Sequence, residues 1–355
     1  MYDPFLRGPF PVGVRTIEAL DTSRDCLFPC EIWYPADAQH AGQDIAPETQ
    51  DAFTPRLRDT QRRQMAIRNA VAQTGTYPLV IFSHFSGGHR RASTFLCTHL
   101  SSHGYVVAAP DHSEVVAPAL ARKEGETPEQ KAARAEAWIR NRVPDIRFLL
   151  DHLLSGDPLG SEIQLDPGRV GIVGHSFGGW AALATPEVDD RIGAIVALAP
   201  GGSSQRRTGI LPVELTFHWG RDIPTLYLVA EDDIALPLTG MYELFERTPA
   251  TKQMVILRRA DHLHFIDNVE QEHEAMRKIP FTADLAWIQE MKPIAELCSG
   301  DQAHLFLRGL TLCHLDAALR RQEEARQFLL GDIEAELARR GVDVILHRPA
   351  LMPLG

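Results

Sequence analysis

Residues 170–184 read VGIVGHSFGGWAALA. Four residues, Val170 to Val173, form a short apolar run, and a second run rich in Ala and Leu begins at Trp180. The first run predicts a buried strand and the second a helix. The intervening G-x-S-x-G, residues 174–178, is typical of a sharp strand-to-helix turn in which glycines permit a close approach of the chain. This segment predicts an exposed, reactive Ser176, with the N–H of Phe177 at the helix N-terminus beside it.

Similar apolar runs lie on both sides of this segment, at residues 79–82, 105–109, 195–198, 226–229 and 254–257. They are continuous rather than alternating, as expected for strands covered on both faces. Helix-like stretches such as 145–154 and 178–185 lie between them. We therefore predict a mostly parallel, doubly wound α/β sheet over residues 77–265. Residues 12–34 read as extended chain and predict antiparallel edge strands.

Composition narrows the function classes. Apolar residues make up 44% and charged residues 23% of the 355 residues, which is ordinary globular usage, and we expect one domain over residues 1–355. The net charge of −11 argues against nucleic acid as the main partner, because phosphate binding needs a basic face. The five cysteines are odd in number and scattered, so we expect buried or half-buried thiols and no metal site.

No apolar run approaches the 18 residues of a membrane span, so no stable membrane insertion is expected. The N-terminus shows no signal-peptide pattern, which makes a cytoplasmic location the default, although a cleaved signal would leave the same sequence.

Three segments lie outside the alternation of predicted strands and helices. Residues 35–76 are polar and residues 113–142 highly charged, with a helix start predicted near residue 128. We interpret both as surface inserts that could form lid elements over the active site, with a solvated face as the alternative. Residues 270–355 form a C-terminal helical part, whose leucines 305, 312, 315 and 319 recur at helical spacing and predict packing on the sheet. Its amphipathic helices would also suit a homodimer.

A serine hydroxyl needs an adjacent base that a third group orients. In the α/β-hydrolase fold the chain order is Ser, then Asp or Glu, then His. The strand at 226–229 runs into Glu231, Asp232 and Asp233, of which we favour Asp233 as the acid. The strand at 254–257 runs toward His262 and His264, of which we favour His262 as the base. A metal site at this His-x-His pair is the weaker hypothesis, since no third ligand lies at a typical spacing.

Several separate blocks also resemble one family. FSHFSGGHRRASTFLCTHLSSHGYVVAAPDH (82–112) resembles the platelet-activating-factor acetylhydrolases, also called group VII phospholipases, and their bacterial dienelactone-hydrolase-like relatives. Further blocks agree in order over residues 8–270: GPFPVGVRT (8–16), EIWYPA (31–36), GHSFGG (174–179), EDDIALP (231–237) and ADHLHF (260–265). The resemblance implies a Ser-His-Asp esterase with an α/β-hydrolase fold and without metal or organic cofactor.

Transferred to this sequence, the resemblance implies Ser176 as nucleophile, Asp233 as orienting acid and His262 as base, with the N–H groups of Ser86 and Phe177 as oxyanion donors. Where the family has a glycine after the oxyanion-loop histidine, this chain has Phe85, which could narrow the acyl pocket. Dienelactone hydrolases proper use a cysteine nucleophile, whereas residue 176 is a serine. We expect substrate contacts from Phe85, His175 and Trp180.

The function predicted from the sequence is that of a short-chain carboxylesterase acting on a small-molecule ester through an acyl-enzyme. The alternatives keep the same triad and change the substrate: a lactone or thioester hydrolase, an amidase, or an esterase on phospholipids or synthetic polyesters and diesters. A binding protein without catalytic activity is the least favoured hypothesis, because all three triad residue types are present.

Overall fold

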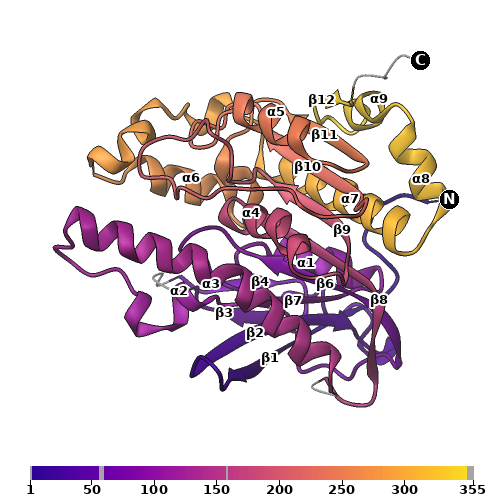
Figure 1. The fold of residues 1–355 in the computed structure, drawn as a ribbon. Coiled ribbons are helices and arrows are strands. Elements are labelled where there is room, and N and C mark those ends of the chain that lie inside the picture. The colour runs from indigo at the N-terminus through magenta and orange to yellow at the C-terminus, as the bar shows by residue number, and fades with distance from the viewer. Residues whose placement is uncertain (1, 56–59, 157–158, 281, 350–355) are drawn as a thin grey trace.

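A ten-stranded sheet forms the centre of the computed structural model, which describes residues 2–55, 60–156, 159–280 and 282–349 (Figure 1). The strand order is β12-β11-β10-β9-β8-β6-β7-β2-β1-β5. The six strands from β7 to β11 are mutually parallel, whereas β12 at one edge and β2 and β1 at the other pair antiparallel. The observed α/β-hydrolase sheet confirms the predicted fold class.

The strands of the sheet include the six predicted apolar runs, which form β6 to β11. Their bounds are β1 Val12–Asp21, β2 Cys26–Pro35, β5 Ile67–Arg68, β6 Gly75–Ser83, β7 Val106–Pro110, β8 Ile163–His175, β9 Ile192–Leu198, β10 Thr225–Ala230, β11 Lys252–Leu257 and β12 Val344–His347. A separate hairpin joins β3 (Asp51–Phe53) to β4 (Arg62–Gln64). The predicted antiparallel edge at residues 12–34 is confirmed as β1 and β2, while the two edge strands β5 and β12 were not predicted, because both are too short to form a recognisable pattern.

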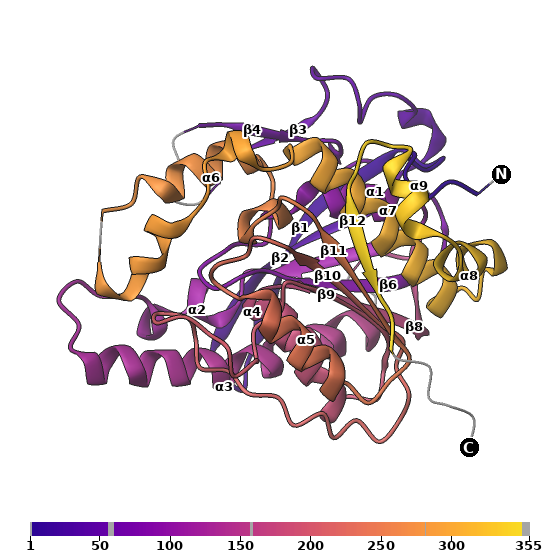
Figure 2. The ribbon, with the colours of Figure 1, turned by 90° about the horizontal axis from the view of Figure 1, so that it is seen from above.

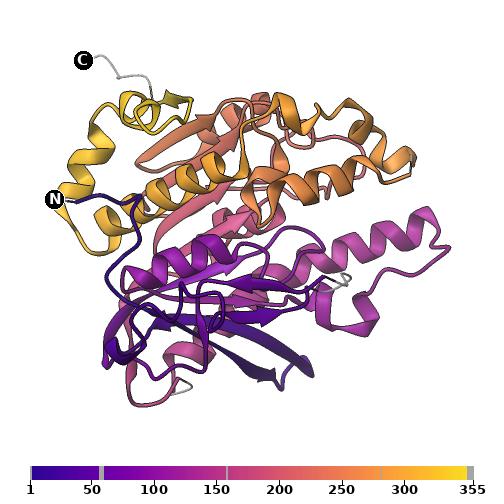
Figure 3. The ribbon, with the colours of Figure 1, turned by 180° about the vertical axis from the view of Figure 1, so that it is seen from behind.

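Helices cover both faces of the sheet (Figures 2 and 3). On one face lie α1 (Thr94–Ser102), α7 (Gly300–Leu319), α8 (Glu323–Leu330) and α9 (Ile333–Ala338), whose apolar residues share a core with Val173 of β8. On the other face lie α3 (Pro128–Leu154), α4 (Phe177–Ala184) and α5 (Leu238–Arg247), which share a core with Ile172. Neighbouring residues of β8 therefore enter opposite cores, which is why the strand reads as continuously apolar.

Local sequence explains where the longest helices begin. Thr127 caps α3 reciprocally with Gln130, and Pro128 occupies the first helical position. Ser299 and Gln302 form the same capping box at the start of α7. Leu312, Leu315 and Leu319 of α7 are buried in the core against the sheet, whereas Leu305 is only half-buried. Within the C-terminal helical part predicted over residues 270–355, the chain leaves the helical conformation between α7 and α8 and again between α8 and α9.

The two inserts are built differently. Residues 35–76 contain the short helix η1 (Ala38–His40) and the β3–β4 hairpin, where an Arg62–Glu272 ion pair joins the hairpin to α6 (Val269–Arg277). Residues 113–142 contain α2 (Ser113–Val116), η2 (Pro118–Leu120) and the first half of α3. The remaining short helices are η3 Thr185–Glu187, η4 His262–Phe265, η5 Ala283–Glu290 and η6 Ile294–Glu296. A lid function of the inserts stays a prediction.

All five cysteines are free and buried, as predicted. Within the described ranges, none of the helices combines the length and the apolar character needed to traverse a bilayer.

Candidate active site

Ser176 occupies the turn between the end of β8 and the start of α4. Its φ of 59° and ψ of −114° lie outside the regions that a side chain normally allows, so the backbone is strained there. The strain is held by three backbone bonds: the Ser176 N–H donates to Leu198 O at 2.9 Å, and its carbonyl accepts from Trp180 at 2.9 Å and Gly201 at 3.0 Å. The turn therefore presents the half-buried serine above the carboxyl edge of the sheet.

Two glycines make this turn sterically feasible. A Cβ on Gly174 would lie 2.1 Å from the carbonyl oxygen of Gly178, and a Cβ on Gly178 would lie 1.9 Å from that of Ser83 at the end of β6. Both contacts are with backbone that cannot move aside. The G-x-S-x-G spacing is therefore a packing requirement of β8, α4 and β6 together.

The three acids after β10 have separate partners. Asp233 is 5% exposed, and its carboxylate accepts the Leu236 N–H at 2.9 Å and faces His262 Nδ1 at 2.6 Å. Asp232 instead bonds Lys292 Nζ at 2.7 Å, and Glu231 bonds the Arg259 N–H at 3.1 Å. Asp233 is thus the acid that the fold brings to a histidine.

The two histidines after β11 also differ in their hydrogen-bond partners. Burial lowers the pKa of His262, but the charge and hydrogen bond of Asp233 outweigh it and the net shift is upward. His264 is buried with both ring nitrogens engaged, Nδ1 with Asp261 at 2.9 Å and Nε2 with the Cys298 carbonyl at 3.0 Å. Burial opposes the charge on His264, yet these bonds raise its pKa to about 10. Both ring nitrogens of His264 are therefore engaged in structural contacts, and neither is left for catalysis.

His262 lies beside the serine turn through its contact with His175. The centroids of the two imidazole rings are 4.7 Å apart, and His175 directly precedes Ser176. No hydrogen bond joins Ser176 Oγ to His262 in the described structure; catalytic bonds of this kind often tighten only when substrate binds.

Two backbone N–H groups, one after β8 and one after β6, have no acceptor among the described residues. Phe177 N–H is the first of α4, where a helix leaves its amides unpaired. Ser86 N–H lies in the loop after β6, next to Gly87, whose φ of 73° is a left-handed conformation that glycine adopts without strain. Phe85 is not left-handed, so its bulk requires no unusual backbone conformation.

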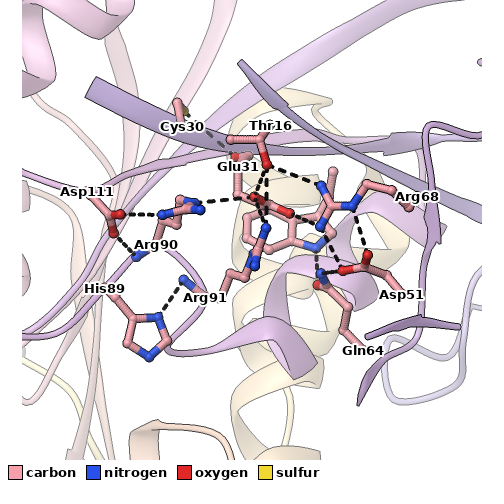
Figure 4. A network of polar contacts seen from close by, with 11 residues as sticks. Thr16, Cys30, Glu31, Asp51, Gln64, Arg68, His89, Arg90, Arg91 and Asp111 are labelled. Atoms are coloured by element: carbon pink, nitrogen blue, oxygen red, sulfur yellow. Dashed lines mark hydrogen bonds and ion pairs between the residues drawn. The ribbon is translucent and has the colours of Figure 1, made fainter. Parts of the chain in front are cut away.

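The far end of this loop is anchored by a buried polar network (Figure 4). Glu31 of β2 is fully buried and pairs with Arg68 at 2.6 Å, Arg91 at 3.1 Å and Arg90 at 3.4 Å. Arg90 also bonds Asp111 through its backbone N–H at 2.7 Å. The loop that carries Ser86 is thus tied to the edge strands of the sheet.

A small apolar cavity of about 40 Å³ opens beside His262. Half-buried Phe85 belongs to the apolar cluster of this region, consistent with a wall of a narrow pocket. The Trp287 indole N–H is buried without a hydrogen-bond partner in the described part of the chain. The residues lining the cavity are Asp232, Ile234, Ala235, Asp261, His262, Leu263, Met276, Trp287 and Met291. The sequence did not predict the lining from residues 270–298, because scattered apolar residues there carry no motif.

His175 and Trp180, for which the sequence predicted substrate contacts, are both buried. His175 is 1% exposed and stacks on Phe265 at 5.2 Å, and burial, followed by repulsion from His262, lowers its pKa well below the usual value. Trp180 is 6% exposed, stacks on Phe177 at 5.3 Å and donates to the Glu214 carbonyl at 2.6 Å. The turn directs both side chains into the core, and their substrate contacts stay a prediction.

Comparisons with known proteins identify similar ester hydrolases. Residues 4–145 match the family model described as platelet-activating factor acetylhydrolase, isoform II. The platelet-activating factor acetylhydrolase of Cavia porcellus is 28% identical over 307 residues, covering 73% of this chain and 67% of that protein. Cutinase est1 of Thermobifida alba is 23% identical over 61% of each chain, so the match spans less than two thirds of that enzyme.

A solved ferulic acid esterase from Streptomyces cinnamoneus superposes with a TM-score of 0.62 at 22% identity, over 88% of this chain and 92% of the esterase, which supports the fold. The chain is therefore a carboxylic ester hydrolase of the α/β-hydrolase fold, similar to the platelet-activating factor acetylhydrolases.

Proposed function

We propose that this chain is a serine esterase in which Ser176, His262 and Asp233 form the catalytic triad. The observation that carries the proposal is the 2.6 Å contact between Asp233 and His262 beside the strained Ser176 turn. A buried carboxylate on Nδ1 fixes the tautomer in which Nε2 is free to accept a proton, and it stabilises the imidazolium that then forms.

The reaction follows from these groups. Ser176 Oγ attacks the ester carbonyl while His262 Nε2 takes its proton, and the tetrahedral oxyanion is stabilised by the N–H groups of Phe177 and Ser86. His262 returns the proton to the departing alcohol, which leaves an acyl-enzyme. Water deprotonated by His262 then attacks the acyl carbon, and Ser176 leaves with the proton as the acid is released.

We further propose short-chain esters as the substrate class. A cavity of about 40 Å³ beside His262 has room for a group of only a few carbons. The relative from Cavia porcellus is named an acetylhydrolase, and the acetyl group is a short acyl group, so this name also supports short-chain substrates. The name of the Thermobifida cutinase is the reason to include polyesters and diesters in the test.

The test is hydrolysis of p-nitrophenyl esters from two to sixteen carbons, with matched lactone, thioester and amide substrates. We expect the highest kcat/KM at about two to four carbons, and a fall in kcat of about 10⁶-fold for Ser176→Ala. A fluorophosphonate probe should label the wild type and not this variant. Undiminished turnover by Ser176→Ala would contradict the triad, and an optimum beyond eight carbons would contradict the substrate class. Homodimerisation stays a prediction that the elution volume on a sizing column can check.

A further inference from the structure

A buried arginine outside the triad contacts both segments that carry the proposed oxyanion donors. Arg142, in the middle of α3, is fully buried. Its Nη1 donates to the His84 carbonyl at 2.6 Å and to Ser83 Oγ at 3.2 Å, at the end of β6. Its guanidinium carbon lies 4.2 Å above the ring of Phe177, which follows the nucleophile. The helices α2, α3 and α4 lie on the same side of the sheet (Figure 2), so α3 reaches both segments.

The charge of Arg142 is balanced and held in place. Nη2 forms an ion pair with Glu114 of α2, whose side chain is also buried. Burial lowers the pKa of Arg142 to about 9, which leaves the guanidinium charged at neutral pH. A planar guanidinium can bond several groups at once and lie flat on an aromatic ring. One side chain thereby fixes the spacing between the loop after β6 and the start of α4.

The loop transmits this placement to the Ser86 N–H. The Phe85 carbonyl accepts His84 Nδ1 at 2.7 Å and the Gly88 N–H at 3.0 Å. Because a carbonyl only accepts, Nδ1 carries the proton, and burial, followed by repulsion from Arg142, lowers the pKa of His84 so that the ring stays neutral. The Phe85 carbonyl and the Ser86 N–H belong to one planar trans peptide and point in opposite directions. Because the direction of the Phe85 carbonyl is fixed, the direction of the Ser86 N–H is fixed as well.

Beneath the loop, the hydrogen bonds of His112 and Ser83 allow one assignment of donors and acceptors. His112 Nδ1 contacts Asp145 at 3.3 Å, and its Nε2 lies 3.0 Å from Ser83 Oγ. Burial lowers the pKa of His112, so the neutral ring donates to the carboxylate through Nδ1 and accepts the Ser83 hydroxyl proton at Nε2. Ser83 Oγ is then free to accept from Arg142. Each group has one compatible role, which makes the arrangement rigid.

We propose that Arg142 is a positioning residue for the oxyanion hole, which it assembles by holding the His84 carbonyl and the Phe177 ring in one fixed arrangement. The proposal rests on the proposed esterase function. Arg142 touches neither substrate nor reacting atoms. Its loss should therefore weaken stabilisation of the tetrahedral oxyanion and leave binding of the ester ground state nearly unchanged.

The experiment compares ester hydrolysis with inhibition by an aryl trifluoromethyl ketone, which forms a tetrahedral oxyanion on an active serine. The test variants are Arg142→Lys and the double variant Arg142→Met with Glu114→Gln, which avoids a stranded buried carboxylate. Removing one oxyanion donor lowers kcat about 10²–10³-fold. In the double variant the N–H groups of Ser86 and Phe177 remain but are displaced, so we expect kcat to fall about 10–100-fold. We expect Ki of the ketone to rise by the same factor, KM to change less than about threefold, and Arg142→Lys to be intermediate.

Arg320→Met is the matched control. Arg320 also bonds two backbone carbonyls, His103 at 2.8 Å and Gly104 at 2.7 Å, pairs with Asp316 at 3.0 Å and lies 3.9 Å above an aromatic ring, that of Tyr105. These contacts lie just before β7 begins, at the amino ends of the parallel strands, whereas the active site lies at their carboxyl ends. We expect this variant to lose stability and keep kcat and Ki within about twofold.

A folded double variant with unchanged kcat and Ki would overturn the proposal, as would a change in KM alone. If the double variant does not fold, Arg142→Lys decides, and kcat within about twofold of the wild type would then overturn it. Failure of the proposed function has a different signature, namely wild-type turnover that survives Ser176→Ala.

Discussion

Replacing Asp233 with Asn tests the central contact of the site. The carboxylate is 5% exposed and lies 2.6 Å from His262 Nδ1. A hydrogen bond to a charged group contributes about 1.5–3 kcal/mol, and each 1.36 kcal/mol changes a rate tenfold. Losing the charge that stabilises the imidazolium should therefore cost about 10–150-fold in kcat. The Asn amide can also donate to Nδ1, which moves the ring proton to Nε2, so that Nε2 can no longer accept a proton from Ser176. With both effects we expect a loss of about 10⁴-fold.

The assay is kcat/KM on a short p-nitrophenyl ester across pH. Only neutral His262 can act as base, and Asp233 holds the pKa of His262 above its ordinary value. Activity of the wild type should therefore rise as pH passes upward through that raised pKa. Asp233→Asn removes the negative charge, so the acid limb of its residual activity should move to lower pH.

Glu231→Gln is the matched control, since Glu231 follows the same strand and bonds Arg258 and the Arg259 N–H instead. We expect its kcat/KM to stay within about threefold of the wild type. More than a tenth of the wild-type activity in Asp233→Asn, or an equal loss in Glu231→Gln, would refute the assignment.

Three further changes probe the surroundings of the site. His264→Gln should lower the free energy of unfolding by about 1.5–3 kcal/mol, because buried Asp261 loses one hydrogen-bond partner and keeps His273 at 2.7 Å. The pKa of His264 is raised from 6.5 to about 10, so this difference should be full below pH 6.5 and shrink as pH rises toward 10 in urea titrations. Trp287→Ala should lengthen the preferred acyl chain by two or more carbons in the ester series, and an unchanged optimum would place the acyl group elsewhere. Gly178→Ala should abolish activity or folding, because its Cβ would lie 1.9 Å from Ser83 O, and an active, stable variant would disprove that clash.

Much of the fold could be predicted because the signals are local. Val170–Val173 and the other apolar runs identify strands buried on both faces, and the glycines at 174 and 178 mark the turn between strand and helix. The edge strand β12 could not be predicted in this way, since its four residues, Val344–His347, become a strand only by pairing with β11.

For the candidate site, too, one part could be predicted from the sequence and another part required the folded chain. The serine motif and the chain order of acid and histidine placed Ser176, Asp233 and His262 at strand ends by sequence alone. The choice among Glu231, Asp232 and Asp233, and between His262 and His264, depended on which partner each side chain meets in the folded chain.

The sequence by itself determined a parallel sheet carrying a serine turn, because periodicity and glycine spacing are properties of neighbouring residues. Only the tertiary structure decided that His175 and Trp180 pack inward and that Trp287 and Met291 line a cavity. It alone also brought Arg142 between Ser83 and Phe177. These contacts join residues far apart in the chain, and their energies depend on burial and on distance across the fold, which no local pattern encodes.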